Sequence, residues 1–339
     1  MVEMQGRTLG DSGIGVGALG FGCWAIGGEW QRPDGNPLGW GAVDDDESVD
    51  AIRRALELGI TFFDTADVYG TGHSEKILGR ALRGHRDEVV LATKWGNLFD
   101  EATRTADGQD ATPGHARRAL TASLRRLGTE YVDLYQLHIS DAPLDAAAEL
   151  RDACEEFVRE GLIRAYAWST DDPERAALFA PGEHCAAVQH TCNVLQDAPE
   201  MLELCAEHGL ASVVRSPLAM GLLARDPGAG ADAGTGWTRG SGDIRTVPPV
   251  WLHWFGEGGL PVPEQAARVA AVRDLLTSGG RTLAQGALAW LWARSPHAVP
   301  IPGIRSVAQA EENAGALRYG PLGEGEMKEI AALLAATAG

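Results

Sequence analysis

Four polar residues have side chains that could act together on a single proton: Asp64, Tyr69, Lys94 and His138. A tyrosine phenol ordinarily has a pKa of about 10, and a neighbouring lysine ammonium would stabilise its phenolate. An aspartate beside the lysine would keep that ammonium charged, and a histidine could orient a substrate oxygen by a hydrogen bond. Taken singly, each residue has a commoner structural role, such as a turn residue or a core histidine. Together they suit proton donation to an alkoxide, which requires no metal ion.

The segments around these residues alternate between strand-like and helix-like patterns. Val49, Ile52 and Leu56 fall on one helical face, and Gly59 then ends that helix. A proline at position 113 fits the first turn of a later helix. Strands are predicted at 18–23, 61–63, 89–92, 131–137, 163–168, 186–189, 211–214 and 298–301, with further helices at 74–82, from 113, around 150–157 and at 283–291.

Eight strands, most of them followed by a helix, indicate one α/β domain over residues 1–339, a closed (β/α)8 or TIM barrel. Strict alternation implies parallel strands joined by helical crossovers. The Gly-rich stretch 7–22 predicts a hairpin that caps the N-terminal mouth of the barrel. No G-x-G-x-x-G follows the first strand, which argues against an open dinucleotide-binding sheet. In a barrel the C-terminal strand ends converge, so the four polar residues are expected to meet in one site.

Three sequence runs contain these four residues. They read DTADVYGTGHSE at 64–75, ATKW at 92–95 and DLYQLH at 133–138, and IPGIRSVAQAEEN follows at 301–313. In order and spacing the set resembles the aldo-keto reductase family across essentially the whole chain. The resemblance implies an oxidoreductase that binds NADP(H) without a Rossmann domain and reduces an aldehyde or ketone. It assigns Tyr69 as general acid, Lys94 and Asp64 as the pair that tunes it, and His138 as the residue that orients the substrate.

The resemblance also implies a set of cofactor contacts. GCW at 22–24 matches the family's stretch beneath the nicotinamide, and RSPLAMGLL at 215–223 matches its segment around the pyrophosphate. Arg245 could add positive charge near the pyrophosphate, although its alignment with the family is looser. Arg305, near a helix start, offers charge-assisted bonds to a 2′-phosphate. The expected cofactor-binding residues are Gly22, Cys23, Trp24, Asp64, Ser169, Thr170, Gln189, Arg215, Ser216, Pro217, Leu218, Gly221, Leu223, Arg225, Gly303, Arg305, Gln309, Glu312 and Asn313.

Two positions depart from the family pattern. Thr170 stands where the family usually has asparagine, and Cys192 stands where it commonly stacks an aromatic ring on the nicotinamide. Such a stack contributes about 1 kcal/mol beyond burial, so its loss would weaken the platform. We hypothesise that Trp168, at the end of the fifth strand, partly replaces the missing ring. The alternative is that Trp168 only packs in the barrel wall.

Several tryptophans are candidates for a substrate pocket. Trp24 and Trp95 adjoin the expected catalytic positions, and Trp30 and Trp40 lie in the loop 27–41. We assign Trp24, Trp30 and Trp95 to the pocket, with packing as an equal alternative for Trp30 and Trp40. An aromatic wall suits a small aldehyde or ketone, with a keto-sugar as a second option, and alcohol oxidation is an open direction.

The segment 218–262 is too long for an ordinary connection and is rich in glycine and proline. Loops of this length are usually functional lids or disordered excursions. Its aromatic residues favour a lid over the cofactor and substrate. These residues are Trp237, Trp251, Trp254 and Phe255.

The composition limits the partners and the location of the protein. A formal charge of -18 disfavours nucleic acid and anionic membranes, so a small-molecule carbonyl or alcohol is the expected partner. No apolar run approaches the roughly 20 residues that cross a bilayer, and no secretory leader is evident at the start, so we expect a cytoplasmic protein. The oligomeric state is not indicated. The five cysteines contain no C-x-x-C pair, which argues against disulfides and structural zinc: Cys23, Cys154, Cys185, Cys192 and Cys205.

Two other classes of function remain as alternatives. One is a non-enzymatic NADP(H)-sensing subunit on the same fold, which a turnover assay would separate from an enzyme. The other is an unrelated barrel such as a metal-assisted hydrolase. The absence of H-x-H and H-E-x-x-H pairs counts against it, and no metal ligands are expected.

Overall fold

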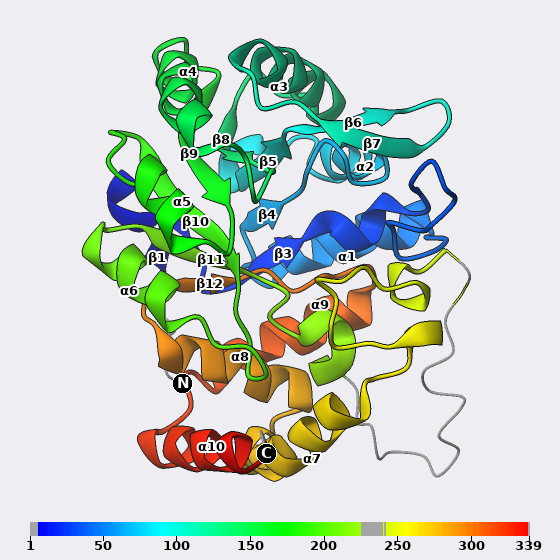
Figure 1. Cartoon of the computed structure of the whole chain (residues 1–339), viewed down its shortest axis with the longest axis vertical. Coiled ribbons are helices and arrows are strands. Elements are labelled where there is room, and N and C mark those ends of the chain that lie inside the picture. Colours follow the sequence, from blue (N-terminus) through cyan, green and yellow to red (C-terminus); the bar gives the residue numbers. More distant parts are fainter. Residues whose placement is uncertain (1–5, 225–239, 241, 338–339) are drawn as a thin grey trace.

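The computed structural model describes residues 6–224, 240 and 242–337. At its centre lies an eight-stranded parallel sheet whose strands follow one another in chain order, as predicted (Figure 1). The first and last strands approach each other through a parallel bridge between Gly22 and Gly303, and the Gly22 amide donates to the Pro302 oxygen at 2.9 Å. The sheet is therefore a nearly closed barrel. Its strands are β3 (Gly20–Gly22), β4 (Phe62–Asp64), β5 (Val90–Trp95), β8 (Val132–Leu137), β9 (Ile163–Ser169), β10 (Cys185–Thr191), β11 (Ala211–Arg215) and β12 (Ala298–Pro300).

Helices surround the barrel, and several begin at side chains that satisfy free amides. The Asp44 carboxylate accepts from the second and third amides of the first helix, and Thr112 caps the helix that begins with a proline. Thr282 and Gln285 form a reciprocal capping box. The described helices are α1 (Asp45–Glu57), α2 (His73–Ala81), α3 (Pro113–Leu127), α4 (Ala147–Arg159), α5 (Pro173–Phe179), α6 (Pro199–Glu207), α7 (Pro263–Thr277), α8 (Leu283–Arg294), α9 (Val307–Gly315) and α10 (Glu324–Ala336).

The N-terminal hairpin is present. Strands β1 (Arg7–Thr8) and β2 (Gly15–Val16) pair antiparallel. Leu9 and Ile14 are buried in the same apolar cluster as Phe62 and Val90 of the barrel strands. The hairpin therefore closes one end of the barrel, and the site must open at the other end.

The structure adds elements that the sequence pattern did not predict. Strand β5 runs on to Trp95, so Lys94 lies within it, and the hairpin β6 (Asn97–Asp100) with β7 (Thr105–Gln109) follows. The hairpin is largely exposed and polar, so it lacks the apolar alternation of a half-buried strand. Helices α5 (seven residues) and α6 (nine residues) were also missed.

The described part of the long segment after β11 packs on the loop that follows β3. The Gly41 amide donates to the Gly242 oxygen at 3.0 Å, and the Ile244 amide donates to the Gly39 oxygen at 2.8 Å. Trp254 and Phe255 are buried, as expected for a structured segment. Trp237 and Arg225 lie outside the described residues.

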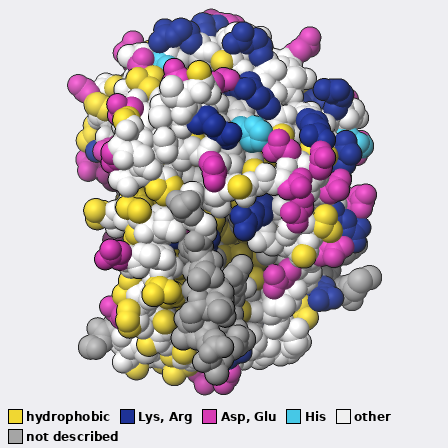
Figure 2. Space-filling model, turned by 90° about the vertical axis from the view of Figure 1, so that its right-hand side faces the viewer, with side chains coloured by type: hydrophobic (Ala, Val, Ile, Leu, Met, Phe, Trp, Pro, Cys, Tyr) yellow, Lys and Arg dark blue, Asp and Glu magenta, His cyan; other side chains and the backbone are white. Residues whose placement is uncertain are grey.

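Charged groups of both signs are interspersed over the upper part of the face seen in Figure 2, and apolar side chains are scattered toward its lower part. Within the described ranges, no helix combines the length and the apolar character that a bilayer crossing needs.

Candidate active site

A cavity of about 1320 Å³ opens at the C-terminal ends of the strands. Five of its lining residues end strands or lie near their ends: Gly22, Asp64, Ser169, Gln189 and Arg215. Because parallel strands in a barrel all end at one rim, residues distant in sequence meet there. The cavity exceeds the roughly 300–1,000 Å³ of a pocket for one drug-sized ligand. It has room for a dinucleotide and a small substrate together.

Lys94 connects the proton-handling residues. Its ammonium nitrogen lies 2.5 Å from Asp64 Oδ1, 2.7 Å from the Thr65 backbone oxygen and 3.3 Å from the Tyr69 hydroxyl. Strands β4 and β5 are neighbours in parallel register, which brings Asp64 beside Lys94, and the loop after β4 carries Tyr69 back over them. Lys94 has no exposed surface, and 2% of Asp64 is exposed. The predicted Asp-Lys-Tyr arrangement is therefore present.

Asp64 is also held from the opposite side of the barrel. Its Oδ2 accepts hydrogen bonds from Gln136 Nε2 and Gln189 Nε2, each at 2.8 Å. Gln136 was not predicted as a site residue. A polar side chain inside the buried strand β8, two residues before His138, was the signal that could have identified it. Gln189, expected at the cofactor, lines the cavity and also fixes this carboxylate.

The electrostatics keep the Tyr69 phenol protonated. Burial raises its pKa above the ordinary value, and the charge of Lys94 acts against burial without reversing it. Lys94 therefore stabilises the phenolate, as expected, but it does not bring the pKa of the phenol below the ordinary value. For Lys94 itself, burial alone would lower the pKa, but Asp64 and Tyr69 hold it above the ordinary value. The result is a neutral phenol donor beside a charged ammonium.

His138 faces Tyr69 as a neutral imidazole. The two rings meet edge to face with centroids 5.7 Å apart. Burial, followed by the charges of Lys94 and Arg215, lowers the pKa of His138 well below its ordinary value. Its Nδ1 is buried and has no hydrogen-bond partner among the described residues. An unsatisfied buried ring nitrogen beside the phenol is suited to a ligand oxygen or amide.

The backbone after β11 is strained where phosphate contacts were expected. Ser216, Ala219 and Met220 have φ of 52°, 45° and 54°, a left-handed conformation that side chains rarely adopt. Such strain clusters at ligand-binding segments. Arg245 stabilises this turn, since its Nη1 donates to the Met220 oxygen at 2.9 Å. Its guanidinium is paired with Asp243 at 2.5 Å, so the Arg245 charge is already compensated and the side chain holds the turn in place.

The expected adenosine end lies on the loop and helix after β12. The Arg305 amide is bound by the Gln309 side chain at 2.9 Å, and the guanidinium reaches the Trp40 backbone oxygen at 3.4 Å. Asn313 is buried to 3% exposure on α9 and faces the cavity. The cavity wall includes these expected cofactor residues: Gly22, Cys23, Trp24, Asp64, Ser169, Gln189, Arg215, Ser216, Pro217, Leu218, Gly221, Gly303, Arg305, Gln309, Glu312 and Asn313.

Residues 18–335 match the family model described as "Aldo/keto reductase family". The chain belongs to this family. It is an oxidoreductase on a barrel fold.

Solved structures of the family extend over nearly the whole chain. A holo-form aldo-keto reductase from Bacillus halodurans is 30% identical with a TM-score of 0.74, covering 97% of this chain and 96% of that one. A glycerol dehydrogenase from Gluconobacter oxydans is 27% identical with a TM-score of 0.78, covering 100% and 97%. An aldo-keto reductase from Klebsiella pneumoniae, in complex with NADPH, is 27% identical with a TM-score of 0.67, covering 98% and 96%.

Curated relatives differ in coverage, and one of them carries a cofactor in its name. An aldo-keto reductase from Bacillus subtilis is 34% identical over 230 residues, which span 65% of this chain and 64% of that protein. The NADH-specific methylglyoxal reductase of Escherichia coli is 30% identical over 324 residues, covering 83% of this chain and 97% of that protein.

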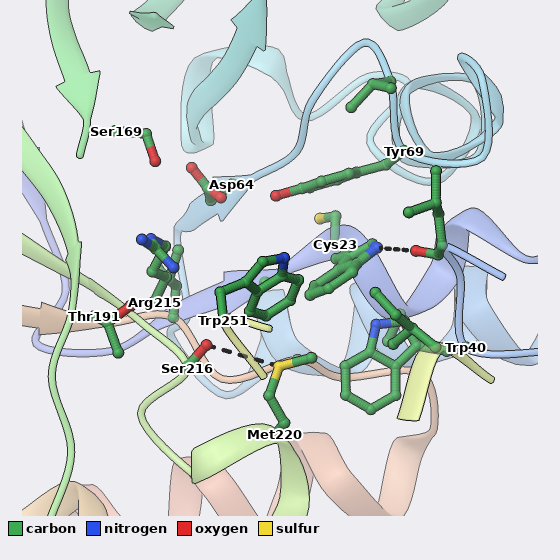
Figure 3. Close-up of a pocket in the computed structure, with 18 of the residues that line it drawn as sticks. Cys23, Trp40, Asp64, Tyr69, Ser169, Thr191, Arg215, Ser216, Met220 and Trp251 are labelled. Atoms are coloured by element: carbon green, nitrogen blue, oxygen red, sulfur yellow. Dashed lines mark hydrogen bonds between the residues drawn. The ribbon is translucent and has the colours of Figure 1, made fainter. Parts of the chain in front are cut away.

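An aromatic group walls the cavity on the side of Tyr69 (Figure 3). Trp24 stacks on Tyr69 with ring centroids 5.9 Å apart and planes at 20°. Trp40 meets Trp24 edge to face at 5.5 Å, and Trp251 lies 6.3 Å from Trp24. Trp251, from the long segment, was not assigned to the pocket from sequence, although its segment was expected to cover the site. Trp30 also lines the cavity, as assigned.

Two aromatic assignments, those of Trp95 and Trp168, are wrong. Trp95 is fully buried against Tyr135, with ring centroids 6.0 Å apart, and is not part of the cavity wall formed by the described residues. Trp168 is also fully buried, donates to the Ile139 oxygen at 2.9 Å and packs on Phe179 at 4.9 Å. It belongs to the barrel wall and cannot replace a nicotinamide stack. Successive side chains on a strand point to opposite faces, and both tryptophans point outward.

The positions of Cys192, Thr170 and Leu223 also differ from expectation. All three are fully buried and are not among the described residues that line the cavity. The Cys192 thiol turns toward Asp197, so no platform position is left vacant by it. The Thr170 hydroxyl donates to the Ser140 oxygen at 2.8 Å, which fixes the loop after β9. These residues pack beneath the cavity wall and do not face the cavity.

One group of possible metal ligands lies outside the cavity among the described residues: Glu155, Glu183 and His184. Glu155 already accepts from the Tyr166 hydroxyl and pairs with His184 Nδ1, each at 2.6 Å. These contacts account for the cluster as a surface hydrogen-bond network.

Proposed function

We propose that this protein reduces an aldehyde or ketone to an alcohol with NADPH, using Tyr69 as the proton donor. The observation that carries the proposal is the fully buried Lys94, whose ammonium donates to both Asp64 and the Tyr69 hydroxyl at the wall of one large cavity. A buried ammonium that contacts a phenol at a cavity wall is suited to stabilising the phenolate left after proton donation.

The residues present fit a nicotinamide dinucleotide. Ser169 and Gln189 offer polar groups to the cavity, and its wall also includes residues of the left-handed turn at 216–221, Arg305 and Asn313. NADPH is bound in the Klebsiella pneumoniae relative. When bound, the reduced nicotinamide supplies a hydride to the carbonyl carbon of the substrate.

The side chains of this protein then handle one proton. Tyr69 donates its hydroxyl proton to the carbonyl oxygen as negative charge develops there. The Lys94 ammonium at 3.3 Å stabilises the phenolate that remains, and Asp64 keeps the ammonium charged. His138, neutral across the cavity, orients the oxygen by a hydrogen bond. No step requires a metal ion.

The aromatic wall supports a small aldehyde or ketone as substrate, with a keto-sugar as the second option. Trp24, Trp40 and Trp251 offer flat apolar faces beside the phenol. The name of the Gluconobacter oxydans relative, a glycerol dehydrogenase, favours alcohol oxidation as the alternative direction. The same groups serve that direction, with the phenolate accepting the proton.

We infer a preference for NADPH over NADH from Arg305, an exposed guanidinium at the mouth of the cavity beside the start of α9. The NADH-specific relative shows that this preference varies among related proteins. Free thiols at all five cysteines support a reducing compartment, and we expect the cytoplasm.

The purified protein should oxidise NADPH in the presence of a panel of aldehydes, ketones and keto-sugars, followed by absorbance. The reverse panel of alcohols with NADP⁺ tests the alternative direction. Tight NADPH binding without turnover of any member would refute the proposal and favour the cofactor-sensing subunit.

A further inference from the structure

Arg215 is a cation of the cavity that the proposed mechanism does not use. It ends strand β11 and lines the cavity, and 29% of its side chain is exposed. Figure 3 shows its guanidinium directed into the pocket, on the side where Asp64 and Ser169 are drawn. The family resemblance placed this residue with the pyrophosphate segment, but its position relative to the proton donor points to another partner.

The guanidinium is fixed in place before any ligand binds. Its Nη2 donates to Asp171 Oδ2 at 2.5 Å. Asp171 is itself held at the end of β10, because its Oδ1 accepts from the Thr191 amide at 2.6 Å and its Oδ2 from the Thr191 hydroxyl at 3.2 Å. A side chain held in this way loses little further freedom when it binds, which favours affinity.

The same contacts leave hydrogen-bonding capacity unused. An arginine has five N–H donors in a planar fork, and the bond to Asp171 is the only one that Arg215 makes among the described residues. Arg245, by contrast, is committed to Asp243 and to the Met220 oxygen. Arg215 is therefore available for a planar oxyanion.

Arg215 acts on both residues that face the substrate oxygen. Its charge lowers the pKa of Tyr69 and of His138, so the guanidinium lies within electrostatic reach of the phenol and the imidazole. A small molecule whose carbonyl oxygen meets Tyr69 and that carries an anionic group would place this group within the electrostatic reach of the guanidinium. Asp64 is paired with Lys94 and would oppose the anion little, whereas Asp171 offsets part of the Arg215 charge, so the attraction relies on the remaining N–H donors of the guanidinium.

We propose that Arg215, positioned by Asp171, binds a carboxylate on the carbonyl substrate, so that the enzyme prefers aldehyde acids or keto acids to neutral carbonyl compounds. The proposal rests on the proposed function and names the substrate class of that same site. Arg–carboxylate pairs are short, charge-assisted and often bidentate, which suits a fixed planar fork. A phosphate oxygen of the cofactor has the same chemistry, and the experiment must separate the two sources.

The test compares an acid with its neutral amide in the NADPH-loaded enzyme. 4-Formylbenzoate and 4-formylbenzamide have nearly the same shape and differ in charge, and succinic semialdehyde with its amide forms an aliphatic pair. We expect the wild type to show at least a tenfold higher kcat/KM for the acid of one pair, mainly through KM. Equal values within both pairs would overturn the proposal, and this comparison needs no variant to fold.

The variants then assign the preference to a residue. Arg215→Met should abolish the preference, so that the ratio of kcat/KM for the acid to kcat/KM for the amide falls toward one, and Arg215→Lys should retain part of the preference. Arg32→Met, which removes an exposed cation at the rim of the same cavity, should keep it fully. If Arg215→Met instead weakens NADPH binding and slows acid and amide equally, the anion is the cofactor's phosphate and the substrate proposal is wrong. Turnover of the amide with NADPH shows that the proposed function stands even where this inference fails.

Discussion

Lys94 has no exposed surface, yet it carries a charge because three oxygens surround its ammonium. Two of them belong to Asp64 and to the Thr65 backbone, and the third is the phenol that must give up a proton. Burying an ammonium costs several kcal/mol unless partners compensate, so such a group is rarely retained without a role. Here the compensation also poises Tyr69 as a donor.

Tyr69→Phe is expected to lower the rate of NADPH-dependent carbonyl reduction by at least about a hundredfold, the scale of a lost general acid. The ring still stacks on Trp24, so the dissociation constant for NADPH should change little. Steady-state kinetics and fluorescence titration measure the two quantities. Retention of most of the activity would remove Tyr69 from the role of proton donor.

Arg305→Ala should raise the dissociation constant for NADPH by roughly tenfold, which corresponds to about 1.4 kcal/mol. The constant for NADH should change much less, because NADH lacks the 2′-phosphate that the guanidinium would bind. Parallel titrations with the two cofactors check this, with Arg318→Ala as a control that removes a charge outside the cavity lining. An equal effect on both cofactors would contradict a phosphate contact.

At the scale of elements, the loop that carries Tyr69 crosses the turn after β3 at very close range. Gly70 has φ of 59°, and a Cβ at this residue would lie 1.9 Å from the Gly27 backbone oxygen. A backbone atom cannot move aside as a side chain can. The position of the phenol therefore depends on a glycine that takes no part in the chemistry.

Gly70→Ala is expected to displace Tyr69 and to lower kcat by tenfold or more, in addition to destabilising the fold. Gly84→Ala is the matched control: its φ of 88° imposes the same left-handed strain of about 1–2 kcal/mol, but nothing lies within 4 Å of the added methyl group. Kinetics and urea unfolding of both variants separate strain from collision. Equal kcat in the two variants would show that the crossing does not position Tyr69.

At the scale of the whole molecule, a formal charge of -18 opposes the binding of an anionic cofactor, and local groups must overcome it. The cavity wall supplies Arg305 for the cofactor and Arg215, which we assign to the substrate. Protonation also enters the stability of the fold through buried histidines. Burial lowers the pKa of His190 to about 4, and that of His138 falls in the same direction.

The free energy of unfolding is expected to decrease as the pH falls from about 6.5 to about 4. In this window the unfolded chain protonates His190 while the folded protein keeps it neutral, so the unfolded state binds more protons. The contribution approaches about 1.4 kcal/mol for each pH unit. As the pH falls, protonation of carboxylates also reduces the net negative charge, which raises the free energy of unfolding. A variant is therefore needed to separate the contribution of His190.

Urea unfolding at several pH values should give a shallower pH dependence for His190→Asn than for the wild type. His85→Asn, at an exposed position, is the control and should keep the wild-type slope. Identical slopes in all three proteins would show that His190 does not titrate as its burial requires.

The order of strands and helices, the polar residues at strand ends and the cofactor class could be predicted from the sequence. Local patterns determine the elements and the strand ends, because apolar periodicity marks each element and a parallel barrel brings every strand end to one rim, whereas the cofactor class came only from the family resemblance. The Asp64-Lys94-Tyr69 contact followed directly from that geometry.

Only the tertiary structure decided which face of a strand or loop each side chain takes. Trp95 and Trp168 turn outward, Cys192 turns away from the cavity, and Trp251 comes to the mouth from a distant segment. Side chains along a strand point alternately to two faces of the sheet. In a buried parallel sheet both faces are covered and carry apolar residues, so the apolar pattern does not show which face a given side chain takes. The net direction of the Tyr69 pKa was likewise decided by burial in the folded protein, which no spacing of charges along the chain reveals.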